Sequence, residues 1–224
     1  MQVDFTELRK RLGLAARQFF DSVRAEHSND RFYSFALCTH DGANCVWAAA
    51  NSEEAYKQAA AQRVADESKT KWLDSHGISL KACLLGDYRW SAFEWQYASV
   101  DPDEFSSVDE LINNRGVGVY DENDPSGFEN FKVCVFASMV LALSDLDADG
   151  YFGVGAARES VTLFCSVADS DCGGWLEKDS ARRLNSPEVF EKFNEERIRW
   201  IAVAPETDPS DPDSLYGPYL SFLP

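Results

Sequence analysis

The sequence of 224 residues has few basic residues and no apolar run long enough to cross a membrane. Its longest apolar stretch, Val133–Leu143, is interrupted only by Ser138 and is far shorter than the ~20 residues of a membrane span. The opening residues, Met1–Leu8, lack the apolar segment of a secretory signal. Only 21 Lys and Arg residues oppose 38 Asp and Glu residues, which gives a formal charge of −17. Such a surface repels nucleic acid and anionic lipid, so we expect a protein that binds neither. Because no signal segment is visible, the expected location is the cytoplasm.

The residues that usually mark metal sites and hydrolases are scarce. None of the six cysteines forms a Cys-x-x-Cys pair, and several lie in apolar runs, where cysteine behaves as a small hydrophobic residue. Cys38 and Cys45 are placed to face each other across a hairpin, although nothing requires a disulfide there. The three histidines form no His-x-x-His pair, and no Gly-x-Ser-x-Gly motif is present. We therefore expect no catalytic residues and no cofactor.

Two loop motifs are incomplete. One resembles the first half of a calcium-binding loop and consists of Asp145, Asp147, Asp149 and Gly150. Its twelfth position, which requires a bidentate glutamate, is Ala156, so we predict no metal site. The other, Gly153–Gly155, lacks the third glycine of a nucleotide-binding loop and precedes a strand instead of following one.

Hydrophobic periodicity predicts most of the secondary structure. Asp4 caps an amphipathic helix that ends near His27, and a hairpin, an alanine-rich helix and a buried central helix follow. The expected ranges are helix 5–27, strands 32–38 and 46–49, helix 51–73, central helix 128–143, strand 161–168, and helices beginning near Trp175 and Pro187. Residues 84–90 are rich in apolar and aromatic side chains and are interpreted as a further strand.

These elements predict a single α+β domain over residues 1–204. Its antiparallel sheet should have about four or five strands with helices packed against it. Residues 205–224 form an acidic, proline-rich tether and an aromatic C-terminal tail.

Arg89, Trp90, Glu94 and Trp95 lie within seven positions and have two interpretations. They line a pocket or an interface, where Trp and Arg concentrate binding energy. Alternatively, the tryptophans are a core pair, and Arg89 bridges to a buried carboxylate such as Asp169 or Asp171. The packing interpretation is favoured, because aromatic residues at helical spacing usually pack.

The segment 101–130 holds nine carboxylates and one arginine, Arg115. Like charges at this density repel one another unless solvent screens them or a cationic partner meets them. We expect Asp121, Glu122 and Asp124 to contact a basic protein.

Several stretches together carry a family resemblance: Phe5–Leu8, Arg31–Leu37, Asn51–Ala55, Arg89–Ser91, Glu94–Trp95, Leu146–Gly153, Ser170–Asp171 and Ser180–Asn185 before Pro187. Their order is similar to that of the bacterial domain of unknown function 4303 family, over about residues 4 to 196. The resemblance implies a cytosolic α+β protein, and it brings no reaction or catalytic residue with it.

The acidic surface, the missing catalytic motifs and the bacterial resemblance indicate a non-enzymatic protein-binding module. More specifically, we expect an immunity-type protein that neutralises a basic toxin by covering it. The alternatives are an adaptor within a larger assembly, and a small-molecule enzyme or ligand-binding domain with a pocket around Arg89, Glu94, Asp169 and Asp171. A deep pocket favours the ligand-binding domain, and a flat acidic face favours the protein-binding module.

Overall fold

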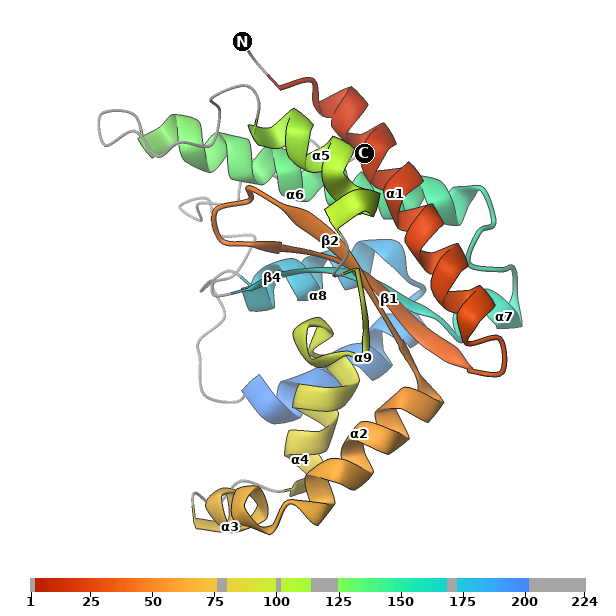
Figure 1. Cartoon of the computed structure of the whole chain (residues 1–224), viewed down its shortest axis with the longest axis vertical. Coiled ribbons are helices and arrows are strands. Elements are labelled where there is room, and N and C mark those ends of the chain that lie inside the picture. Colours follow the sequence, from red (N-terminus) through yellow and green to blue (C-terminus); the bar gives the residue numbers. More distant parts are fainter. Residues whose placement is uncertain (1–2, 76–79, 100–101, 114–124, 169–172, 202–224) are drawn as a thin grey trace.

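A sheet with helices on both faces forms the centre of the molecule (Figure 1). The computed structural model describes residues 3–75, 80–99, 102–113, 125–168 and 173–201. The strands, in the spatial order β3-β2-β1-β4, are β1 (Phe32–His40), β2 (Val46–Ser52), β3 (Tyr97–Ala98) and β4 (Thr162–Ala168). The predicted α+β class is confirmed. The sheet is not wholly antiparallel, because β4 pairs in parallel with β1. The predicted domain boundary at residue 205 and the tail beyond it lie outside the described residues.

One face of the sheet is covered by three helices: α1 (Phe5–Glu26), α5 (Pro102–Asn113) and α6 (Pro125–Ala148). The side chain of Asp4 caps α1 by accepting hydrogen bonds from the N–H groups of Thr6 and Glu7, both at 3.0 Å. Helix α6 is the predicted central helix, and Val135, Phe136 and Leu143 are fully buried in it. An apolar helix of this kind is stable only when neighbours cover it, and here α1 and the sheet help to bury most of the side chains from Phe131 to Leu143.

The opposite face carries most of the remaining helices (Figure 1). They are α2 (Glu53–Ala65), α3 (Glu67–Ser75), α4 (Leu80–Cys83), the π-helix η1 (Leu84–Trp90), the 3₁₀ turn η2 (Ala92–Glu94) and α9 (Pro187–Ile201). The expected strand over 84–90 is wrong, since this segment is the π-helix η1. The expected single helix over 51–73 is two helices, because α2 ends at Ala65 and α3 begins at Glu67.

The hairpin of β1 and β2 contains a β-bulge at Tyr33. Phe32 pairs with Ser52 and Ser34 pairs with Asn51, so Tyr33 has no opposite residue. A bulge reverses the alternation of side chains. Tyr33 therefore joins the core cluster on the η1 and α9 side instead of the α1 and α6 side. The two cysteines on either side of the hairpin turn, Cys38 and Cys45, are free thiols.

Strand β4 lies at one edge of the sheet, and side chains at α8 (Gly173–Leu184) complete its hydrogen bonding. The Leu163 N–H donates to Asn185 Oδ1 at 2.9 Å, and Asn185 Nδ2 donates back to the Leu163 carbonyl at 2.8 Å. The Cys165 N–H donates to Ser180 Oγ at 2.8 Å. These contacts give the stretch 180–185 a structural role, because an exposed edge strand would otherwise have unpaired backbone groups. The short helix α7 (Ala156–Glu159) precedes β4.

Candidate functional site

Arg89 stands at the end of η1 and is the centre of a buried polar network. Its guanidinium lies over the rings of Tyr33 and Tyr56, 4.3 and 5.1 Å from their centroids. Arg89 Nη2 donates to Glu53 Oε1 at 2.9 Å, and Arg89 Nε lies 3.2 Å from Glu196 Oε2. Only 8% of the residue is exposed. Removing one member of such a pair leaves an unpaired buried charge, which costs about 3–5 kcal/mol. Arg89 is therefore a structural residue.

The network also supplies hydrogen-bond donors to backbone carbonyls at the end of η1. The Tyr33 hydroxyl donates to the Arg89 carbonyl at 2.9 Å, and the Trp95 indole N–H donates to the same carbonyl at 3.2 Å. Asn51 Nδ2 donates to the Tyr33 hydroxyl at 2.8 Å and to the Tyr88 carbonyl at 3.0 Å. The sheet thus holds the π-helix through side chains of β1 and β2, and the bulge at Tyr33 aims the phenol at this position.

Burial and charge shift the pKa values of three groups in the network. Burial raises the pKa of the Tyr33 phenol well above its ordinary value, and the nearby charge of Arg89 offsets this only in part. Burial also opposes ionisation of the Glu53 carboxyl, but the hydrogen bond and charge of Arg89 outweigh it and lower the Glu53 pKa. For Arg89 itself, burial is the largest cause and lowers the pKa, but the hydrogen bond to Glu53 and the charges around the guanidinium together outweigh it and raise the pKa. The pair therefore stays ionised at neutral pH.

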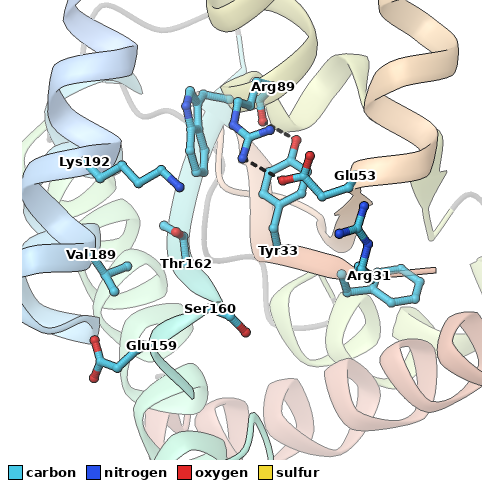
Figure 2. Close-up of a pocket in the computed structure, with 11 residues that line it drawn as sticks. Arg31, Tyr33, Glu53, Arg89, Glu159, Ser160, Thr162, Val189 and Lys192 are labelled. Atoms are coloured by element: carbon cyan, nitrogen blue, oxygen red, sulfur yellow. Dashed lines mark hydrogen bonds and ion pairs between the residues drawn. The ribbon is translucent and has the colours of Figure 1, made fainter. Parts of the chain in front are cut away.

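A cleft of about 490 Å³ opens beside this network (Figure 2). Its walls come from the start of β1, from η1, from the α7–β4 connection and from α9. The lining residues are Arg31, Phe32, Tyr33, Glu53, Arg89, Trp90, Glu159, Ser160, Thr162, Val189 and Lys192. The volume lies within the range of about 300–1,000 Å³ that is typical of small-molecule sites.

The charged groups of the cleft differ in how far they are already paired. Arg31 Nε lies 3.1 Å from Glu54 Oε1 and is largely exposed. Glu159 accepts a hydrogen bond from the Ser186 hydroxyl at 2.5 Å. Lys192 makes no hydrogen bond or ion pair with any residue in the part of the chain that the structure describes. Figure 2 shows its side chain reaching from α9 into the cleft toward Thr162.

The residues predicted from the sequence are divided between sites. Arg89 and Trp90 line the cleft, whereas Glu94 and Trp95 line a second hollow of about 330 Å³ with Asn51. Trp90 and Trp95 are buried at 4% and 6% exposure. They pack in one cluster, as the packing interpretation predicted. Arg89 does bridge to carboxylates, but in the described structure these are Glu53 and Glu196. The other predicted residues lie outside the described residues: Asp121, Glu122, Asp124, Asp169 and Asp171.

Sequence reasoning missed Lys192, Thr162 and Glu53 as parts of one site. Each has an ordinary local role: Thr162 begins β4, Glu53 begins α2, and Lys192 lies on an exposed face of α9. Tyr33 and Glu53 lie in stretches that carry the family resemblance, Arg31–Leu37 and Asn51–Ala55, but the resemblance assigns neither residue a role. No spacing signal connects these positions, because they come from separate elements.

Each aspartate of the incomplete calcium loop accepts a hydrogen bond from an arginine. Asp145 accepts from Arg9 Nε at 2.6 Å, and Asp149 accepts from Arg17 Nη2 at 3.4 Å. Asp147 accepts from Arg158 Nε at 2.5 Å. Within the described ranges, no group of three or more His, Cys, Asp or Glu residues is arranged to hold a metal ion. No helix in those ranges has the length and apolar character needed to span a bilayer.

Comparison with known proteins gives one family match. The family model described as "Domain of unknown function (DUF4303)" matches residues 12–186. The resemblance inferred from the sequence is thereby confirmed. No curated protein and no solved structure gives a significant match.

Proposed function

Because the chain belongs to the DUF4303 family, whose description assigns no activity, we propose a function from its charge and surface. The protein is a non-enzymatic binding module that neutralises a basic protein partner by covering it, in the manner of an immunity protein against a toxin. The observation that carries this proposal is the formal charge of −17 on 224 residues. A charge of this size attracts cationic proteins and accelerates their association.

Helix α9 carries part of this charge in an unpaired form. Glu188, Glu191 and Glu195 lie at positions i, i+3 and i+7, so they share one face of the helix. All three are exposed, and none has a hydrogen bond or ion pair to another described residue. Their mutual repulsion is relieved when a cationic surface docks on this face.

The carboxylates of the acidic segment 101–130 are not all unpaired. Asp109 accepts from the Val46 N–H at 3.4 Å, and Glu129 lies 3.4 Å from Lys132 Nζ, so both carboxylates serve the fold. Glu104 and Glu110 make no such contact within the described part of that segment. The contact of Asp121, Glu122 and Asp124 with a partner stays a prediction, since these residues lie outside the described ranges.

The experiment begins with capture of partners from the native cytosol and continues with association rates measured across a range of salt. Two neutralised variants are compared: Glu188, Glu191 and Glu195 changed to Gln, and Asp121, Glu122 and Asp124 changed to Asn, Gln and Asn. A dispersed variant is the control, with Glu26→Gln, Glu67→Gln and Asp149→Asn. It changes the net charge equally without altering either acidic cluster.

If either cluster is the interface, its variant should associate more slowly than the control at low salt, and the two rates should converge at high salt. The variant on α9 should keep the parent's fold, because exposed charges without internal pairing contribute little to stability. If both clustered variants associate at the same rate as the control at every salt concentration, neither acidic face is the interface and the proposal fails.

A ligand-binding domain is the second candidate, and the cleft beside Arg89 favours it. The residues that line this cleft differ from those expected from the sequence. Arg89 belongs to it, but Glu94 lines a different hollow. In the described structure the cleft is lined instead by residues that include Glu53, Thr162 and Lys192.

A further inference from the structure

The cleft combines apolar walls with charged groups of both signs. Phe32, Tyr33, Trp90 and Val189 supply the apolar surface. The charged lining residues are three cations and two carboxylates: Arg31, Arg89, Lys192, Glu53 and Glu159. The two arginines are paired with carboxylates, so recognition of an anion depends on whether the third cation is left without an ion pair.

The pairing pattern shows where that anion would bind. Arg89 is held by Glu53 and Glu196, and Arg31 by Glu54. Lys192 is therefore the lining cation that forms no ion pair with a described residue.

Thr162 offers a second group beside Lys192. The residue is 6% exposed, and its carbonyl accepts from the Ser34 hydroxyl at 2.9 Å. Its own hydroxyl has no hydrogen-bond partner in residues 3–75, 80–99, 102–113, 125–168 or 173–201. In Figure 2 the Thr162 side chain and the Lys192 ammonium point toward the same part of the cleft. An ammonium beside a free hydroxyl can bind the two oxygens of one carboxylate.

We propose that the cleft binds a small organic monocarboxylate. Its carboxylate contacts Lys192 and Thr162, and its apolar body lies against the aromatic wall. One unpaired ammonium matches one negative charge. The carboxylates of Glu53 and Glu159, together with the acidic surface, repel a dianion such as a phosphate ester. This inference rests on the ligand-binding candidate and is independent of a basic protein partner.

Calorimetry on the full chain with four related probes tests this assignment. The probes are benzoate, neutral benzamide, dianionic phenyl phosphate and cationic benzylamine. Benzoate should bind at millimolar or lower concentration, and each of the others at least about tenfold more weakly, since a charge-assisted contact is lost or reversed. Lys192→Gln should weaken benzoate binding about tenfold, and Lys192→Arg should restore much of it.

Lys10→Gln on α1 is the matched control, because Lys10 is also exposed and the change in net charge is equal. It should bind benzoate like the parent. Thermal melts should show that Lys192→Gln keeps the parent's stability, since the side chain is exposed and has no hydrogen bond or ion pair with a described residue.

The outcomes distinguish the ligand-binding cleft from the monocarboxylate assignment. Tighter binding of benzamide, benzylamine or phenyl phosphate than of benzoate would leave a ligand-binding cleft and overturn the monocarboxylate assignment. Unchanged benzoate binding by Lys192→Gln would overturn the site. If none of the four probes binds at ~10 mM, the monocarboxylate proposal is wrong and the ligand-binding candidate loses its support. Capture of a basic protein has no bearing on any of these results.

Discussion

Asn185→Ala removes the side chain that completes the edge of β4. The amide of Asn185 accepts from the Leu163 N–H at 2.9 Å and donates to the Leu163 carbonyl at 2.8 Å. It also donates to the Ala181 carbonyl at 2.7 Å, which holds it at the end of α8. Alanine leaves the outward backbone groups of Leu163 without a partner next to a fully buried side chain.

The expected loss in the free energy of unfolding follows from the hydrogen bonds that alanine cannot make. Each hydrogen bond contributes about 0.5–1.5 kcal/mol, and a buried donor left unsatisfied costs about 1–3 kcal/mol. Asn185 itself is half-buried, so in the alanine variant water can reach some of the unpaired backbone groups, which reduces the loss of stability. We expect a loss of about 2–4 kcal/mol in the free energy of unfolding. For a chain of this length, that lowers Tm by about 5–15 °C.

Urea denaturation and amide hydrogen exchange together measure this effect. The Leu163 amide should exchange faster in Asn185→Ala, whereas the Leu37 amide in the interior strand β1 should change only with global stability. Asn29→Ala is the control, because Asn29 is an exposed asparagine without a hydrogen bond to described residues. If Asn185→Ala loses no more stability than Asn29→Ala, the proposed completion of the β4 edge is wrong.

Three further predictions follow from packing, pH and metal. Phe136→Ala should lower the free energy of unfolding by about 3–5 kcal/mol, because Phe136 is fully buried in α6; a parent-like urea midpoint would contradict this. The pKa of Glu53 is held below its ordinary value of 4.5, so its contribution to stability is present above that pH and is lost as the pH falls through the folded value. Glu53→Gln should therefore flatten the acid limb of a stability–pH curve, and an equally steep limb would refute the coupling. Calcium at sub-millimolar concentration should not shift Tm, because Asp147 and its neighbours pair with arginines; a shift abolished by Asp147→Ala would show a metal site.

Local elements were predictable where neighbours in the sequence decide them. The cap of α1 by Asp4 and the buried helix α6 follow from side-chain oxygen chemistry and from the length of an apolar run. Strand β4 follows from its β-branched and aromatic residues. The segment Leu84–Trp90 has a similar composition but is a π-helix. Its backbone carbonyls bond to Tyr33 and Asn51, which belong to β1 and β2 and lie far away in the sequence.

The candidate site was predictable only in part for the same reason. Arg89 and Trp90 drew attention as an unusual local cluster, and they do line the cleft. Lys192 and Thr162 have no local signal, since an exposed lysine and a threonine at the start of a strand are ordinary residues. Their proposed role in binding rests on their both lining the cleft, which the folded chain alone shows.

The sequence by itself determined the α+β class, the family and the strong negative charge. The class and the charge follow from composition and short-range periodicity, and the family follows from the order of the stretches that carry the resemblance. The tertiary structure alone decided the parallel pairing of β1 with β4, in which Ser34 bonds to a residue 128 positions away. Periodicity tells which side of an element is apolar, but it does not tell which other element covers that side. The cleft depends on that second choice, because its walls come from segments that meet only when the chain has folded.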